Sequence, residues 1–168
     1  MLNAHLVLKD GAPSQNKKYD ALTKWSSALQ VMHFDDVSTA EKVAETLDGP
    51  MIGGFAKLAA ELQIHLVLGS FNERAPTKGK CYNTSVVFAP DGSIAATYRK
   101  IHLFDVDCDA GVRFKESDTV EAGESPSLAG TPMGTLGLSI CYDLRFPELY
   151  RHYARAGADI LTVPSAFT

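Results

Sequence analysis

Three residues of this chain have side chains that could carry out covalent chemistry together: Cys141, Lys100 and Glu116. Cys141 ends an apolar run at residues 134–141, and residues 147–156 after it have the composition of a helix. A thiol at a strand-to-helix turn lies beside backbone N–H groups, here that of Tyr142, which favour a thiolate and can bind an oxyanion. The pattern indicates a nucleophile, although a buried structural cysteine is the commoner alternative for such a position.

Lys100 lies near the end of a β-rich run at residues 93–101. Alternation along a strand places Ile94, Ala96, Tyr98 and Lys100 on one face. A lysine among apolar neighbours needs a partner, unless its stem lies on apolar surface and its ammonium reaches water. Glu116 belongs to a connection at residues 104–132 that is rich in Gly, Asp, Ser and Pro, and its alternative interpretation is a solvated loop carboxylate.

The hydrophobic patterns predict an α/β protein. Residues 48–64 are predicted to form a helix with Phe55, Leu58, Ala59 and Leu62 on one face, and residues 65–71 a buried strand. Residues 84–89 and 93–101 suit a hairpin, and residues 134–141, 147–156 and 159–163 suit a strand, helix and parallel strand. In the N-terminal part we expect a strand at 2–8 and a helix at 15–32.

Composition limits the classes of function. With 45% hydrophobic and 21% charged residues, the 168 residues suit one soluble domain, 1–168, whose first 47 residues have weaker patterns. The net charge of -4 disfavours nucleic acid and anionic lipid as partners, and the sequence has no apolar run of membrane-spanning length. We expect a cytoplasmic protein that binds neither nucleic acid nor membrane.

The cysteines predict neither disulfides nor a metal site. Cys81, Cys108 and Cys141 are an odd number at wide spacings, without a C-x-x-C pair. We therefore expect no metal and no cofactor, and a redox or metal protein is the weakest alternative. A dyad of Cys141 with His102 or His152 is also disfavoured, because His152 lies well along the predicted helix.

Two long motifs resemble one enzyme family. The stretch GLSICYDLRFPEL at residues 137–149 is similar to the nucleophile motif of the nitrilase, or carbon-nitrogen hydrolase, superfamily, and TYRKIHLFD at 97–105 resembles its lysine motif. The residues of both motifs are most similar to those of the Nit-type amidase branch, and the similarity covers about residues 48–168. The resemblance implies an α-β-β-α sandwich and a Glu, Lys, Cys triad.

Residue by residue, the resemblance makes Cys141 the nucleophile and Lys100 the group that stabilises the oxyanion, beside the backbone N–H of Tyr142. Glu116 resembles the family's auxiliary glutamate, which positions the lysine and the substrate. The family's general base is the Glu of a Pro-Glu pair upstream of the lysine motif, and this sequence has no Pro-Glu before residue 147. The corresponding region offers only Asp35 and Asp36.

The resemblance implies a hydrolase that cleaves the C–N bond of a small linear amide through a cysteine thioester, like an omega-amidase or a deaminated-glutathione amidase. The family sequence continues beyond the Pro-Ser-Ala-Phe stretch at 164–167, so we expect an incomplete domain, divergent at 1–47 and truncated at its C-terminal end. The alternative is a catalytically impaired fragment or assembly partner without the glutamate base. A homo-oligomer is expected if the fold is complete.

Overall fold

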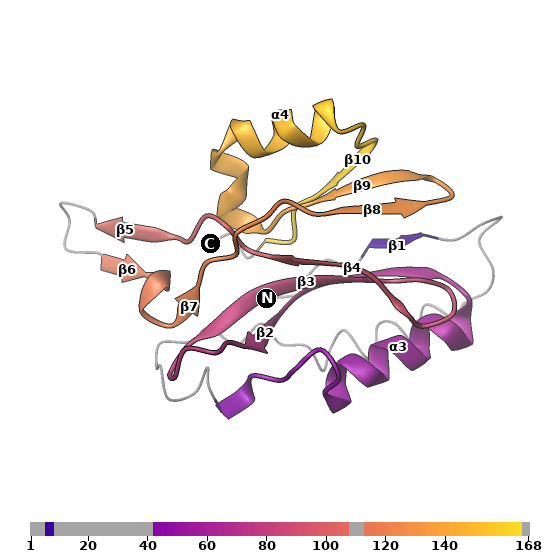
Figure 1. Cartoon of the computed structure of the whole chain (residues 1–168), viewed down its shortest axis with the longest axis horizontal. Coiled ribbons are helices and arrows are strands. Elements are labelled where there is room, and N and C mark those ends of the chain that lie inside the picture. Colours follow the sequence, from indigo (N-terminus) through magenta and orange to yellow (C-terminus); the bar gives the residue numbers. More distant parts are fainter. Residues whose placement is uncertain (1–5, 9–41, 108–112, 166–168) are drawn as a thin grey trace.

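The computed structural model of the chain describes residues 6–8, 42–107 and 113–165. Its elements form two stacked β-sheets with a helix outside each (Figure 1). In chain order these elements are β1 (Leu6–Leu8), α3 (Pro50–Leu62), β2 (His65–Arg74), β3 (Cys81–Phe88), β4 (Ile94–Arg99), β5 (Asp105–Asp107), β6 (Arg113–Lys115), the 3-10 helix η1 (Glu116–Asp118), β7 (Val120–Glu121), β8 (Leu128–Thr131), β9 (Gly134–Leu138), the 3-10 helix η2 (Cys141–Arg145), α4 (Pro147–Arg155) and β10 (Ile160–Thr162).

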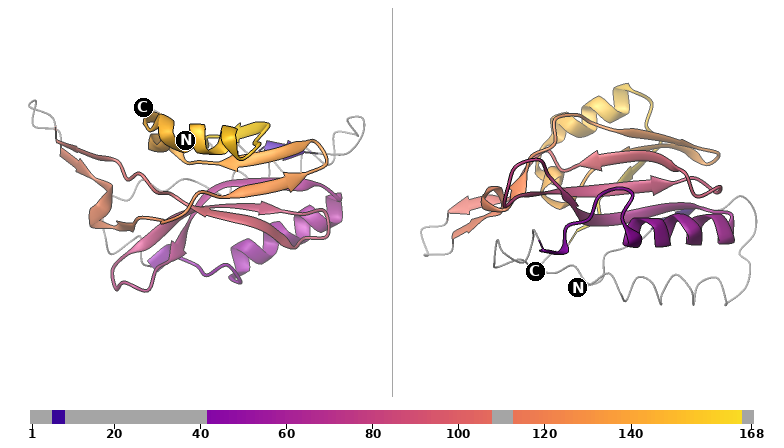
Figure 2. Two further views of the ribbon diagram at one scale, coloured as in Figure 1. Left: turned by 45° about the horizontal axis from the view of Figure 1, so that its top comes forward. Right: turned by 60° about the horizontal axis from the view of Figure 1, so that its bottom comes forward.

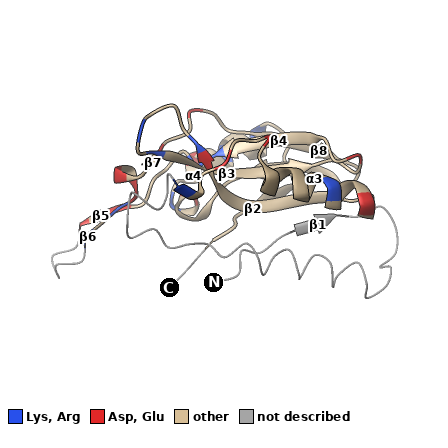
Figure 3. Ribbon diagram, turned by 90° about the horizontal axis from the view of Figure 1, so that it is seen from below, with Lys and Arg blue, Asp and Glu red and all other residues tan. Residues whose placement is uncertain are grey.

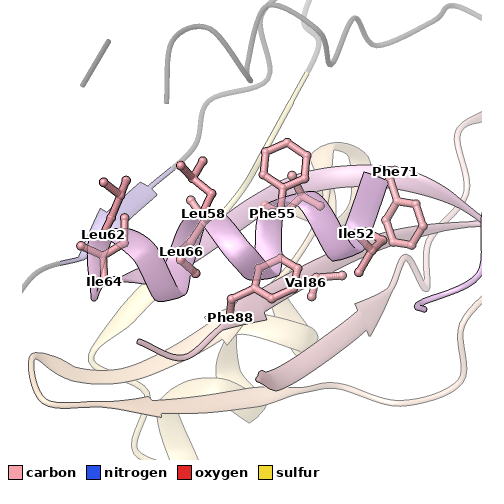
Figure 4. Packing of buried hydrophobic residues seen from close by; sticks show 11 residues of the cluster. Ile52, Phe55, Leu58, Leu62, Ile64, Leu66, Phe71, Val86 and Phe88 are labelled. Carbon is pink, nitrogen blue, oxygen red and sulfur yellow. The ribbon is translucent and has the colours of Figure 1, made fainter. Parts of the chain in front are cut away.

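Helix α3 confirms the helix predicted at 48–64. Pro50 stands in its first turn, where its missing N–H leaves no intrahelical bond unmade. Gln63 ends it with φ 51°, and its N–H donates to the carbonyls of the last turn. The predicted face belongs to one buried cluster with side chains of the first sheet, and Figure 4 labels its residues Phe55, Leu58 and Leu62. Burial of this apolar stripe is the main contribution to the stability of the helix in its place.

The first sheet has the strand order β1-β2-β3-β4, and β7 pairs in parallel with β3. The predicted hairpin is confirmed as the antiparallel pair β3 and β4. Its turn closes with the Ala89 N–H donating to the Ser93 carbonyl at 2.8 Å, and Gly92 has φ +83°, which favours glycine. Strand β2 continues to Arg74, beyond the predicted residue 71, because its outer part pairs with the start of β3.

The second sheet has the order β10-β9-β8 and contains the predicted strand, helix and parallel strand. Strands β9 and β10 are parallel and α4 connects them. A Cβ on Gly137 would lie 2.8 Å from the Tyr153 ring, so glycine lets α4 pack directly on β9. The Tyr153 hydroxyl donates to the Leu138 carbonyl, and burial raises the pKa of Tyr153 to about 12. This tyrosine therefore stays protonated and fixes the helix to the strand.

The layers are α3, first sheet, second sheet and α4, as both views of Figure 2 show. Successive residues of β2 and β3 divide between two clusters: Leu66 and Val86 face α3, whereas Val67 and Val87 face the second sheet. Strands β2 and β3 are thus buried on both sides, which explains their continuous apolar runs at 66–68 and 86–88. The expected α/β class and α-β-β-α layering are confirmed.

The region 104–132 differs from the long connection that we predicted. It contains β5, β6, η1, β7 and β8, and the β5–β6 hairpin projects away from the sandwich (Figure 1). Strands of two to four residues are too short to show a period of two, so the sequence did not reveal them. Ile94 also departs from its predicted apolar face, because it is 40% exposed at the start of β4.

Several expectations lie outside the described residues: the helix at 15–32, the carboxylates Asp35 and Asp36, and the thiol of Cys108. The strand predicted at 2–8 is described only as β1, which pairs antiparallel with β2. Within the described ranges, no helix is long and apolar enough to cross a membrane. Seen from the side of α3 and β2, acidic and basic positions are interspersed (Figure 3).

Replacing Phe55 by alanine tests the packing of α3. Phe55 is 2% exposed within the cluster between α3 and the first sheet, so Phe55→Ala is expected to lower the free energy of unfolding by about 3–5 kcal/mol. Lys57→Ala, on the exposed side of the same helix, should change it by less than about 0.5 kcal/mol. Urea denaturation followed by circular dichroism measures both, and equal losses would contradict the packing described.

Candidate active site

Cys141 lies at a sharp turn between β9 and α4. It opens the 3-10 helix η2 with φ +47°, in the left-handed region that a residue with a Cβ rarely adopts. The Cys141 N–H donates to the Pro164 carbonyl at 3.0 Å, and the Ser139 N–H donates to the Thr162 carbonyl at 3.1 Å. These hydrogen bonds to β10 and to the residues after it stabilise the unfavourable backbone conformation of the turn. Cys141 is partly exposed at this turn.

The turn is closed by the carboxylate of Asp143, which is completely buried. Its Oδ2 accepts hydrogen bonds from the Ile140 N–H and the Tyr98 hydroxyl, both at 2.8 Å. Its Oδ1 accepts from the His102 N–H at 3.1 Å and lies 2.7 Å from His102 Nδ1. A buried charge is tolerated when donors surround it, and here four donors do so.

Lys100 forms an ion pair with Glu116. Lys100 Nζ lies 2.5 Å from Glu116 Oε2, and the two side chains are 3% and 12% exposed. The same Oε2 accepts from the Phe104 N–H at 2.6 Å, and Oε1 accepts from Asn83 Nδ2 at 3.4 Å. The ammonium is thus fixed in direction. Of the two interpretations of Lys100, the paired lysine is correct and the solvent-reaching one is wrong.

Asp143 connects the segment of the lysine to the segment of the cysteine. Tyr98 and His102 lie two residues before and after Lys100, and Asp143 lies two residues after Cys141. Because one carboxylate holds both segments, the ends of β4 and β9 are fixed to each other. The pKa of Tyr98 is raised, first by burial and then by the charge of Asp143, so the hydroxyl stays a donor.

Aromatic rings continue from the cysteine turn towards the β5–β6 hairpin. The Tyr142 ring packs edge-on against Phe104, at 4.9 Å between centroids, and against Phe146 at 5.4 Å. Phe104 contacts Phe114 of β6 at 5.5 Å, and His102 stacks on Phe146 at 3.8 Å. Phe104 and Phe114 are more than a third exposed, so they give this side an apolar surface.

Sequence reasoning missed part of this arrangement. No local pattern predicted that the Asp143 carboxylate binds Tyr98 of β4 and His102, which follows that strand. Glu148 of α4 forms an exposed ion pair with Arg151 at 2.5 Å. Nothing in the sequence marked Asn83 as a site residue, apart from its position just before the predicted hairpin.

Cys81 is buried, whereas Cys141 is partly exposed. Cys81 is 1% exposed, and burial, with a smaller contribution from Glu116, raises its pKa to about 11.

His102 is occupied by Asp143, and in the described part of the chain no three His, Cys, Asp or Glu side chains gather as a metal site would require. A cavity of about 330 Å³ beside the β2–β3 turn, lined by Arg74, Lys78 and Lys80 among others, includes none of the predicted site residues.

Comparison with known families shows which family the chain belongs to. The model of the carbon-nitrogen hydrolase family matches residues 24–167. The chain belongs to this family. The recognition made from the two motifs is therefore confirmed, and the match includes all three predicted site residues.

Curated relatives of this carbon-nitrogen hydrolase include omega-amidase NIT2 of Homo sapiens, 45% identical over 124 residues. That alignment covers 74% of this chain and 44% of the human protein. Nitrilase homolog 2 of Dictyostelium discoideum is 44% identical over 77% of this chain and 40% of its own length. The chain thus spans less than half of the length of these relatives.

The fold of this carbon-nitrogen hydrolase is also found in solved structures. The C. elegans NitFhit protein superposes with a TM-score of 0.72 at 31% identity, covering 90% of this chain and 40% of that chain. An amidase from Nesterenkonia sp. AN1 has a TM-score of 0.60 at 26% identity, covering 76% and 43%. That mutant amidase carries the acetamide moiety of fluoroacetamide on its active-site cysteine.

Removing the charge of Asp143 tests how strongly the turn depends on it. Asp143→Asn turns an NH₂ group towards donors that the carboxylate had bound, so the free energy of unfolding should fall by about 2–4 kcal/mol. Asp107→Asn, in an exposed pair with Arg113 at 3.8 Å, should change it by less than about 0.5 kcal/mol. Urea midpoints distinguish the two, and equal midpoints would show that Asp143 is not needed.

The difference between the two described thiols is measurable by alkylation. With a pKa of about 11, Cys81 is thiolate in about one molecule in ten thousand at pH 7, so Cys141 should react with iodoacetamide at least about tenfold faster. Raising the pH from 7 to 9 should accelerate Cys81 about a hundredfold, since its thiolate fraction rises tenfold per pH unit below the pKa. Peptide mapping reports each site, and Cys141→Ser is the control. Equal rates at pH 7 would contradict the burial described for Cys81.

Proposed function

We propose that this chain provides Cys141, Lys100 and Glu116 for the hydrolysis of a small linear amide by an omega-amidase. The supporting observation is that Asp143 holds the cysteine turn against the segment of the buried Lys100–Glu116 pair. The relatives named omega-amidase support the same reaction, and nothing in them favours the alternative of an impaired assembly partner. Because the chain spans less than half of those relatives, the activity is a proposal for it.

In the proposed reaction the Cys141 sulfur attacks the amide carbon and forms a C–S bond, and the carbonyl oxygen becomes an oxyanion. The Lys100 ammonium and the Tyr142 N–H stabilise that charge. The C–N bond then breaks, and the nitrogen takes up the proton that the Cys141 thiol lost and leaves as ammonia. Water attacks the thioester, releases the carboxylic acid and restores the thiol.

Glu116 has a positioning role in this scheme. Its carboxylate binds Lys100 Nζ at 2.5 Å while the Phe104 N–H holds the same oxygen, so the lysine cannot swing freely. A stabilising charge that is fixed before the reaction needs no reorganisation when the oxyanion forms. The region in which the family resemblance implies a general base, about residues 30–36, lies outside the described residues, so no role is assigned to Asp35 or Asp36.

The proposed substrate is the terminal amide of a short dicarboxylic acid, in preference to a nitrile. The names of the omega-amidase relatives support the dicarboxylic amide, and the structures of Nesterenkonia amidase with butyramide and with an acetamide adduct support an amide over a nitrile. No cofactor has a part in the scheme, and the proposed location is the cytoplasm. Assembly into homo-oligomers stays a prediction, to be tested by light scattering of the purified chain.

Ammonia release from such an amide tests the proposal. Cys141→Ala should lower kcat by at least about 10³, since the bond-forming atom is removed, and Lys100→Met should lower it by about 10²–10³. Lys57→Ala, on the outer side of α3, should leave kcat unchanged. Intact-mass spectrometry of a quenched reaction should show an acyl group on Cys141. A chain that is folded but releases no ammonia and forms no adduct would refute the proposed function.

A further inference from the structure

The backbone of Lys100 is held from two sides. Its N–H donates to the Asn83 carbonyl at 2.8 Å, and its carbonyl accepts from the Gly123 N–H, also at 2.8 Å. Lys100 follows the last residue of β4, so these bonds extend the support of the strand to the lysine itself. With the backbone fixed and Nζ on Glu116, a displacement of the backbone would pull the ammonium away from its partner.

Gly123 lies so close to the Arg99–Lys100 peptide that there is no space for a side chain at residue 123. A Cβ built on Gly123 would lie 2.2 Å from the Arg99 carbonyl oxygen and 2.8 Å from the Arg99 carbonyl carbon. Both contacts are with backbone, so no rotation of a side chain could relieve them. An alanine would have to displace the Arg99–Lys100 peptide, or its own segment, by about 1 Å to reach ordinary contact distance.

The segment that carries Gly123 is itself anchored. Just before it, β7 pairs with β3, and the Tyr82 hydroxyl donates to Glu121 Oε1 at 2.9 Å. On the other side of the contact, the Arg99 guanidinium binds the buried Glu73 through Nε at 2.8 Å and lies 4.2 Å from the centroid of the Tyr82 ring. Both partners of the close contact are therefore fixed by their own bonds.

From these contacts we infer that Gly123 is a positioning residue for the proposed hydrolysis. Its missing side chain lets the chain after β7 bind the Lys100 carbonyl and set the ammonium against Glu116. Gly123 acts through Lys100 and does not touch the substrate. The inference rests on the proposed function of Lys100, and it predicts that every residue other than glycine at this position misplaces the lysine.

Gly123→Ala and Gly130→Ala form a matched pair of variants. Gly130 is an exposed glycine of β8, and a Cβ there would meet no atom within 4 Å. We would label the amines with an acylating ester and measure the rate at Lys100 relative to the exposed Lys57 by peptide mass spectrometry. In wild type and Gly130→Ala, Lys100 should stay protected, whereas in Gly123→Ala its relative rate should rise by on the order of tenfold, because the ammonium loses the buried ion pair that shields it from the reagent.

Kinetics give a readout that general destabilisation would not produce. Gly123→Ala should lower kcat for amide hydrolysis by about ten- to a hundredfold with KM nearly unchanged, because an oxyanion-stabilising charge is misplaced by about 1 Å. In a Lys100→Met background the same change should lower kcat by less than about twofold, since the group through which glycine acts is gone. An equal loss of kcat in both backgrounds would overturn the inference.

The labelling experiment separates this inference from the proposed function. If the wild-type chain releases no ammonia, the proposed function is refuted. The labelling rate of Lys100 in Gly123→Ala would still show whether Gly123 positions the lysine. Should urea denaturation show Gly123→Ala to be unfolded, Tyr82→Phe replaces it, because that variant removes only the hydroxyl that anchors Glu121. Its Lys100 labelling should rise by about two- to tenfold. Unchanged labelling in the folded variant would overturn the inference.

Discussion

The buried carboxylate of Asp143 is the interaction on which the candidate site depends. Four donors from two segments converge on its two oxygens, and Tyr98 and His102 provide three of them. A buried charge without partners would be costly, so the chain at β4 and the turn after β9 must come together for the fold to be stable. The same constraint holds Cys141 in a left-handed backbone conformation that it would rarely adopt alone.

Two ion pairs then fix the end of β4 in opposite directions. Arg99 and Lys100 are adjacent in the sequence, and each binds a carboxylate from a different element, Glu73 of β2 and Glu116 of η1. Because Glu73 and Lys100 are buried, removal of one partner would leave an uncompensated charge. This arrangement connects the core of the first sheet with the irregular segment at 104–127, and it gives Lys100 one direction in which to point its ammonium.

Much of the fold was predictable because its signals are local. The period of α3, the turn chemistry between β3 and β4, and the apolar runs of β9 and β10 all lie within short windows of sequence. The elements from β5 to β8 were not predictable, since strands of two to four residues are too short to show a period in the sequence. Asn83 and Gly123 carry no signal of their own for the same reason: their roles consist of contacts with residues distant in the sequence.

The sequence by itself determined the family through its two long motifs, and the resemblance then predicted the layers of the sandwich and the three residues proposed for the site. Only the tertiary structure decided that Lys100 is paired, that Asp143 joins the lysine segment to the cysteine turn, and that Gly123 lies against Arg99. These three facts depend on distances between segments separated by 16 to 45 residues. Such distances are set by the packing of two sheets, which no local pattern of residues contains.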